Sequence, residues 1–241
     1  LPGDTFLASC DRPPTPLRIA RFARPPISDG PVHPEVIAGY ERAAELLERL
    51  GHRVEDVELE LPPSTVPVFE RVWSVGSASW PLPPEREAEL RPLTRWLRER
   101  GRALDGPGAI NALIGMRQSG AAVLRSLAPY DAVLTPTLAQ PPVLVGELRD
   151  DDDPAGDFEA QKAFTPFTAI WNVTGMPAVS LPMHWTPDGL PVGVMLASRP
   201  GADELVLQLA AQVEAACVVD ERWPHPATPF TGPHAWPPAA P

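Results

Sequence analysis

Hydroxyl and amide side chains occupy two short segments with the chemistry to bind a polar ligand. Thr135-Pro-Thr137 follows an apolar run, and its proline should end a buried strand and turn both hydroxyls toward the strand's carboxyl end. Ligands of open α/β sheets tend to bind at that edge. Asn172-Val-Thr-Gly175 joins a helical pattern to a strand pattern. We interpret Asn172 first as a cap that fixes this turn and second as a ligand-binding amide.

The common catalytic motifs are absent from the sequence. It holds no Gly-x-Ser-x-Gly elbow, Walker loop or His-Glu-x-x-His pair, and Gly106-Pro-Gly108 is interpreted as a loop before a helix. Of the five histidines, His184 at a strand end is the best candidate for a general base, although a structural polar role is simpler. Cys10 and Cys217 have small or apolar neighbours typical of inert thiols, and two cysteines define no disulfide framework or metal site.

Composition limits the classes of function. The 241 residues are 44% hydrophobic and 21% charged, a globular mixture large enough for a sizeable core. A net charge of −11 argues against nucleic-acid binding. No apolar run approaches the ~20 residues of a membrane helix, and no signal peptide precedes Leu1, so a cytoplasmic location is expected. The acidic run Asp150–Asp153 is interpreted as a solvated loop rather than a cation site, and no metal or cofactor is expected.

Hydrophobic periodicity indicates the elements that would position these groups. Alternating residues predict strands over 17–22 and 54–61, on either side of a helix over 34–50 that starts at a proline. This order suggests a βαβ unit. Further helices are predicted over 66–80, 85–103, 109–127, 158–170 and 203–216, and further strands over 131–135, 177–183 and 190–197. The turn Thr186-Pro-Asp-Gly189 should make the last two strands a hairpin. The predicted fold class is α/β, with a mixed β-sheet flanked by helices.

Two further expectations concern exposure. The inner face of the helix over 109–127 is predicted to consist of its large apolar residues Ile110, Leu113, Ile114, Ala121, Leu124 and Leu127. A polar loop is predicted over 140–157. The 34 prolines crowd toward both ends, which predicts an extended Pro-rich tail over 221–241.

Three ordered segments carry a family resemblance. They are Tyr130-Asp-Ala-Val-Leu-Thr-Pro-Thr137, then Phe164 to Ser180 with its Asn-Val-Thr-Gly-Met-Pro-Ala core, then Asp188-Gly-Leu-Pro-Val-Gly-Val-Met-Leu196. Together they resemble the C-terminal half of the amidase-signature family. Leu1-Pro-Gly3 and Pro92-Leu-Thr-Arg-Trp-Leu97 are also similar to members of that family, so the resemblance covers nearly the whole chain. It implies that residues 1–241 are the C-terminal part of a single amidase-signature domain.

The resemblance implies a chemistry whose parts this sequence does not contain. Members of the family hydrolyse amides with a serine–cis-serine–lysine triad and a Gly/Ser-rich oxyanion loop, all in the N-terminal half. Gly76-Ser-Ala-Ser79 is the nearest Gly/Ser stretch here and lacks the required glycines, and Lys162 is the only lysine. We therefore expect no catalytic residue within this chain. The absence of an initiating Met also suggests that the chain starts inside a longer protein.

The resemblance does imply that this half forms one wall of the substrate pocket. The candidate substrate-binding residues are Thr137, Phe167, Thr168, Trp171 and Asn172. Glutamine-processing members carry an acidic residue near the position of Thr165, so a general amide hydrolase acting on apolar, aryl or oligomeric amides is favoured here. The expected partners are a small-molecule amide and the N-terminal catalytic half, and a homodimer is left open. The alternative is a non-catalytic amidase-like chain that serves in binding or assembly.

Overall fold

A five-stranded mixed sheet organises the molecule. The computed structural model describes residues 5–219, so the predicted tail over 221–241 lies outside the described residues. The strand order is β2 (Arg53–Asp56), β1 (Arg18–Arg21), β3 (Ala132–Pro136), β5 (Pro191–Ser198) and β4 (Ala178–Trp185). β1 is parallel to β2 and β3, whereas β5 is antiparallel to β3 and β4. The expected βαβ unit, hairpin and mixed sheet are confirmed.

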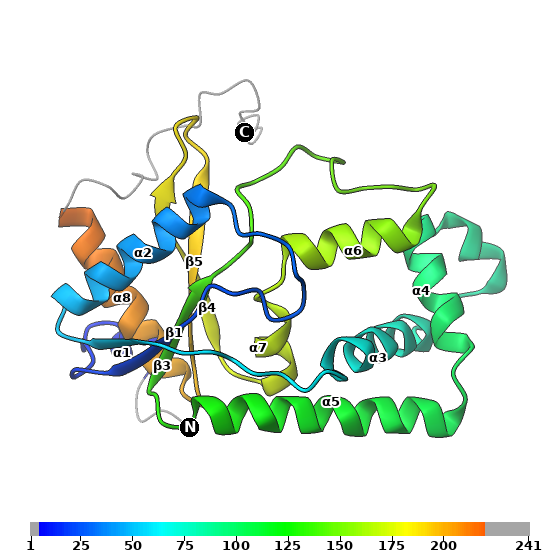
Figure 1. The fold of residues 1–241 in the computed structure, drawn as a ribbon, viewed down its shortest axis with the longest axis horizontal. Helices are drawn as coiled ribbons and strands as arrows, with labels where there is room; N and C mark the ends of the chain where they lie inside the picture. Colours follow the sequence, from blue (N-terminus) through cyan, green and yellow to red (C-terminus); the bar gives the residue numbers. More distant parts are fainter. Residues whose placement is uncertain (1–4, 220–241) are drawn as a thin grey trace.

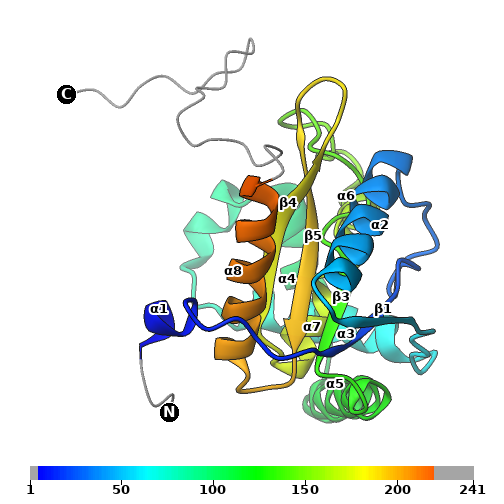
Figure 2. The same ribbon diagram turned by 90° about the vertical axis from the view of Figure 1, so that its left-hand side faces the viewer.

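Helices cover both faces of this sheet (Figures 1 and 2). On one face lie α2 (Pro34–Arg49) and α8 (Asp203–Val219), and on the other lie α5 (Gly106–Leu127) and α7 (Ala169–Thr174). Beyond the second face, α3 (Thr65–Ser79), α4 (Pro92–Arg102) and α6 (Pro154–Phe164) extend the molecule to the side. The short α1 (Phe6–Ser9), which the periodicity did not predict, contacts α8.

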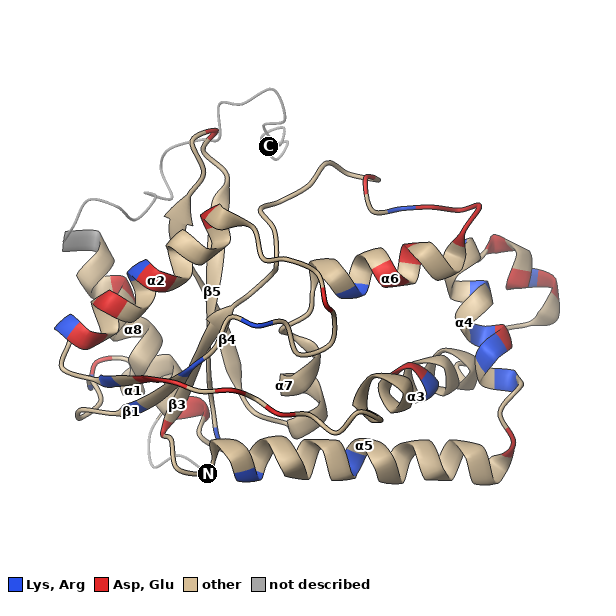
Figure 3. Ribbon diagram, viewed as in Figure 1, with Lys and Arg blue, Asp and Glu red and all other residues tan. Residues whose placement is uncertain are grey.

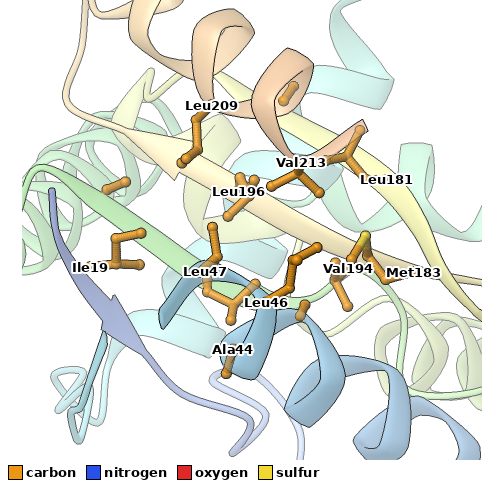
Figure 4. Close-up of a cluster of buried hydrophobic side chains, with 14 of the residues drawn as sticks. Ile19, Ala44, Leu46, Leu47, Leu181, Met183, Val194, Leu196, Leu209 and Val213 are labelled. Carbon is orange, nitrogen blue, oxygen red and sulfur yellow. The ribbon is translucent and has the colours of Figure 1, made fainter. Parts of the chain in front are cut away.

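Each face of the sheet has its own apolar core. On the first face, residues of β1, β3, β4 and β5 pack against α2 and α8, as Figure 4 shows for Ile19, Leu47, Leu196 and Leu209. On the second face, the buried members of the cluster are Ala20, Phe22, Val123, Leu127, Val133, Phe167, Ile170, Trp171, Met176, Met195 and Ala197. Alternate residues of the strands therefore contribute side chains to two cores, as expected for a sheet between helical layers.

Three predicted elements are shorter or divided, each for a local reason. The strand predicted over 54–61 ends at Asp56, where a last bond from Val57 N to Arg21 O of β1 at 3.0 Å closes the ladder, and the later residues Leu59 and Leu61 pack against the second core. The helix predicted over 85–103 is a 3-10 helix, Pro84–Glu89, followed by α4. Arg91 has extended backbone angles because a residue before proline avoids the helical region. The helix predicted over 158–170 is divided into α6 and α7 around Pro166.

Two helices start earlier than predicted. Gly106-Pro-Gly108 is the first turn of α5, not a loop, because Asp105 caps it by accepting a hydrogen bond from Gly108 N at 2.7 Å. Likewise, α6 begins at Pro154, inside the predicted loop, with Asp153 accepting from Gly156 N. Asp153 is thus a helix cap, whereas Asp150–Asp152 are exposed residues of the predicted solvated loop.

The predicted inner face of α5 was wrong in its first half. Ile110, Leu113 and Ile114 are 57%, 41% and 47% exposed, whereas Val123 and Leu127 farther along are buried. α5 extends past the sheet, and only its second half packs against the core. Periodicity indicates which residues share a helical face but not what that face contacts.

Close packing between α3 and α4 gives a sharp prediction. A Cβ on Gly101 would lie 2.2 Å from the carbonyl oxygen of Ser74, whereas one on Gly76 would meet nothing within 4 Å. Gly101→Ala should therefore lower the free energy of unfolding by about 3 kcal/mol, because the helices must separate. The matched control Gly76→Ala should raise it by about 0.5–1 kcal/mol, because alanine is the better helix former. Urea denaturation measures both, and equal effects would contradict this packing.

Candidate functional site

A cavity of about 630 Å³ opens between α3, α4, α5 and α7. Its wall is dominated by apolar and aromatic side chains. They are Phe69, Val72, Trp73, Trp80, Pro81, Leu82, Leu90, Met116 and Val173. Phe69 and Trp73 stack with ring centroids 5.4 Å apart. Trp73 and Trp80 are 50% and 75% exposed, so the aromatic surface remains accessible. An apolar cavity of this size with a few polar groups is typical of small-molecule sites.

Asn172 supplies a side-chain amide to this wall. It lies within α7, and its Nδ2 donates to the carbonyl oxygen of Thr168 at 3.3 Å. Gly175, at φ 68°, ends the helix instead, with its N–H bonded to Trp171 O. The interpretation of Asn172 as the helix cap was therefore wrong. Because Asn172 is exposed, its amide oxygen is free to accept a hydrogen bond from a ligand.

A buried arginine fixes one side of the cavity. The segment 80–91, here called the strap, runs from the end of α3 to α4 and contributes Trp80, Leu82 and Leu90 to the wall. Arg98 of α4 is only 4% exposed and donates to the carbonyl oxygens of Ser77 and Trp80 at 2.6 and 3.0 Å. It also binds the Glu87 carboxylate of the strap at 2.8 Å. Arg98 thus ties the strap to the end of α3.

The strap's carboxylate gives a pH-dependent prediction. Hydrogen bonds from Arg98 and then Arg102 lower the pKa of Glu87 from 4.5 to about 2. A depressed carboxylate pKa adds stability above the ordinary value, and this is lost as the pH falls toward the folded value. Glu87→Gln should therefore destabilise the chain at pH 7, and its difference from the unmodified chain should shrink between pH 4.5 and 2. Urea denaturation across this range tests the prediction. The control Glu89→Gln, in an ion pair exposed on both sides, should have little effect.

The other candidate substrate-binding residues lie elsewhere in the fold. Phe167 and Trp171 are 0% and 4% exposed and belong to the second core. Thr168 precedes α7 and donates its hydroxyl to Thr165 O at 3.1 Å. Thr137 follows β3, where its hydroxyl lies 2.7 Å from that of Ser180. Of the five, only Asn172 lines the cavity, and a binding role for the others remains a prediction.

Lys162, the only lysine, is held as a cation. Its Nζ lies 2.5 Å from Glu70 Oε1 and 2.7 Å from Glu159 Oε1. Burial would lower the pKa of Lys162, but hydrogen bonds to the two carboxylates outweigh it and raise the pKa above its ordinary value. A general base must be neutral at working pH. These ion pairs favour a structural role for Lys162, and the expectation that the catalytic residues lie outside this chain stays a prediction.

The serine stretch of α3 is likewise structural. The hydroxyls of Ser77 and Ser79 donate to the carbonyl oxygens of Trp73 and Val75, one helical turn earlier. An oxyanion loop needs backbone N–H groups that point at the ligand. In a helix those groups are used internally, so Gly76-Ser-Ala-Ser79 does not form such a loop.

The described histidines have structural partners. His52 Nδ1 accepts from Leu17 N, and its Nε2 lies 2.9 Å from Gln212 Oε1. His184 Nε2 lies 2.5 Å from Glu35 Oε2, and no serine or cysteine is bonded to it among residues 5–219. Within the same residues, no group of three or more His, Cys, Asp or Glu side chains is placed to hold a metal ion. No helix there has the length and apolarity needed to cross a membrane.

The sequence did not indicate the aromatic cavity or its arginine. Trp73, Trp80 and Arg98 lie on separate elements that show ordinary amphipathic patterns, and only packing brings them together. The one available signal is compositional, because the chain has seven tryptophans, a residue type that is highly buried on average but rarely fully buried. The sequence does show the strap's prolines, Pro81, Pro83 and Pro84, which follow directly after α3.

Comparisons with known proteins give a consistent result. The family model described as Amidase matches residues 2–207. AmiC of Mycobacterium tuberculosis, described as an amidase, is 36% identical over 210 residues, which cover 83% of this chain and 43% of AmiC. The 6-aminohexanoate-cyclic-dimer hydrolase of Paenarthrobacter ureafaciens is 32% identical over 245 residues, covering 89% and 49%.

Solved structures share the fold. A 6-aminohexanoate cyclic dimer hydrolase superimposes with a TM-score of 0.73 at 24% identity, covering 90% of this chain and 48% of that one. A bacterial aryl acylamidase of the amidase-signature family gives 0.68 at 20% identity, covering 90% and 47%. The chain therefore spans about half the length of the relatives that it matches. The family model and these relatives show that the chain belongs to the amidase family.

Proposed function

We propose that this chain is the substrate-side part of an enzyme that hydrolyses a carboxylic amide. In this proposal the C–N bond is cleaved by a serine–cis-serine–lysine triad that lies outside the chain. Two observations together carry the proposal. The apolar cavity is accessible, and the only lysine of the chain, Lys162, is held in an ion pair. The family relatives are about twice as long, so the remaining length is available for the triad.

The cavity favours an apolar amide as substrate. Phe69, Trp73 and Trp80 offer ring faces to hydrocarbon or aryl groups, and the Asn172 amide can orient one polar group. Thr165, where glutamine-processing members carry an acidic residue, donates its hydroxyl to Gln161 O and offers no charge. We therefore expect aryl or oligomeric amides to be better substrates than glutamine.

A complementation experiment tests the proposal. The part of M. tuberculosis AmiC outside its 210-residue match would be co-expressed with residues 1–241, and hydrolysis of 4-nitroacetanilide followed by release of 4-nitroaniline. Turnover by the complex, absent from either part alone, is the expected result. A purified complex without turnover on this anilide or on a panel of linear and cyclic oligoamides would contradict the proposal.

A cavity-filling variant of that complex tests where the substrate lies. Gly76→Trp should place an indole in the cavity and lower kcat/KM for the anilide at least about tenfold, because bound substrate and indole compete for the same space. Arg71→Trp, at an exposed position of the same helix outside the cavity, is the control and should change it little. Equal effects would show that the substrate lies elsewhere.

A second function is favoured by one observation. The chain's own Ser/Gly stretch, Gly76-Ser-Ala-Ser79, is regular helix and so forms no oxyanion loop. A non-catalytic amidase-like chain that binds an apolar ligand or assembles with another protein would need none. In that case the complex with the AmiC part would not form. Residues 1–241 would bind an apolar anilide, and adding the AmiC part would not change the affinity.

A further inference from the structure

A smaller pocket adjoins the aromatic cavity where α3, α5 and α7 meet (Figure 1). This inner pocket measures about 20 Å³, room for about one water molecule. Its wall includes the buried side chains of Val123 and Ile170. Three residues, Phe69, Met116 and Val173, line both the inner pocket and the aromatic cavity. Their side chains therefore form the partition between the two spaces.

The inner pocket suits an uncharged, apolar group. None of its lining residues carries a charge, and α7 contains no Lys, Arg, Asp or Glu (Figure 3). Two hydroxyls line it, those of Thr65 and Ser119, which lie 3.0 Å apart and bond to each other. Because the two hydroxyls pair with one another, an entering hydrocarbon chain would cost neither of them its partner.

Two of the three partition side chains are held in place. The ring of Phe69 stacks on Trp73 with centroids 5.4 Å apart. Val173 packs so closely against α5 that a Cβ on Gly120 would lie 3.2 Å from Val173 Cγ1. A valine within a helix also has one strongly preferred χ1 angle. Neither side chain can therefore move aside without losing these contacts.

Met116 is the movable member of the partition. A methionine side chain is unbranched and has three rotatable bonds, so it adapts to the space around it. The backbone of α5 is held at this point, because a Cβ on the preceding Gly115 would lie 2.9 Å from Val68 Cγ2. Met116 itself is only partly buried. Rotation of its side chain is therefore the smallest movement that joins the inner pocket to the aromatic cavity.

We propose that Met116 is a specificity-determining gate, which turns aside to admit the end of a straight acyl chain into the inner pocket. The inference rests on the proposed function and narrows its substrates to amides of straight-chain acids. A chain that ends at the partition leaves Met116 in place, whereas a longer chain displaces it. Each further methylene group that becomes buried should tighten binding about fourfold.

Binding of 4-nitroanilides with straight acyl chains of increasing length tests the gate. In isothermal titrations of residues 1–241, the affinity should rise about fourfold per methylene group and stop rising at a limiting chain length. Met116→Ile makes the gate stiff at χ1. Its limiting length should be shorter by about two methylene groups, which weakens binding of the longer chains about tenfold, and 4-nitroacetanilide should bind as before. An unchanged limiting length would overturn the proposal, as would failure of the chain to bind any anilide.

Met116→Leu is the matched control, because leucine and isoleucine are isomers and only isoleucine is branched at Cβ. It should keep the limiting length of the unmodified chain, and a shortening equal to that of Met116→Ile would overturn the proposal. Ser119→Thr tests the inner pocket from its far side, since it adds one methyl group and keeps a hydroxyl for Thr65. It should shorten the limiting length by about one methylene group. If Met116→Ile does not fold, this variant decides.

The titrations distinguish this inference from the proposed function, because binding by residues 1–241 requires no catalytic group. A shortened limiting length in Met116→Ile, combined with no turnover by the complex with the AmiC part, would support the gate and contradict the proposed function. Turnover by that complex, combined with one limiting length in all variants, would do the reverse.

Discussion

Replacing Phe167 with alanine is expected to lower the free energy of unfolding by about 3–5 kcal/mol. Phe167 is 0% exposed and has the largest of the fully buried side chains in the described part of the chain. Its ring lies in the core between the sheet and helices α5 and α7, which also contains Trp171 and Val133. Removing it leaves a cavity that a close-packed core can fill only in part. Urea denaturation of the variant measures the loss.

Phe167→Leu is the control for this prediction, because it keeps most of the apolar volume and should cost about 1 kcal/mol. The experiment also bears on function, since Phe167 is one of the candidate substrate-binding residues. A Phe167→Ala chain with unchanged stability but altered ligand binding would contradict the core role described here and favour the binding role.

Replacing Arg98 with alanine should lower the free energy of unfolding by about 3 kcal/mol. The loss is this large because Arg98 is only 4% exposed, so its removal leaves the carbonyl oxygens of Ser77 and Trp80 without their charged donor in a buried site. The strap would also lose its connection to α3. Because the strap carries Trp80 and Leu90, the cavity should lose its fixed shape together with stability.

Arg102→Ala provides a matched control, because Arg102 binds the same Glu87 carboxylate but is 51% exposed. An exposed ion pair contributes less than about 1 kcal/mol. Comparable losses for the two variants would show that the carboxylate contact dominates. A large loss for Arg98→Ala alone would show that the buried carbonyl contacts hold the strap.

Local pattern was sufficient for most of the fold. The alternation in Leu17–Phe22 and the helical spacing after Pro34 identified β1 and α2, and the Pro-Asp-Gly turn identified the β4–β5 hairpin. Two of the departures share one cause. Residues 57–61 and the first half of α5 are apolar in a regular pattern, but the surface each contacts depends on tertiary packing that spacing does not encode.

The site was less accessible to sequence reasoning than the fold. Asn172 was identified from a family segment and does line the cavity, although as a residue inside α7 rather than its cap. Trp73, Trp80 and Arg98 were not identified, because the cavity brings them together from α3, the strap and α4. The expectation that this chain lacks the triad rests on a count of lysines and Gly/Ser stretches, which needs no three-dimensional information, and it stays a prediction.

Hydrolysis of 4-nitroacetanilide by purified residues 1–241 tests the central claim most directly. The claim is that this chain carries the substrate side of an amidase and none of its catalytic groups, because Lys162 is ion-paired and the serines of α3 lie in regular helix. Release of 4-nitroaniline should not exceed the rate in buffer alone. Turnover above that rate, abolished by replacing a serine within residues 1–241, would contradict it.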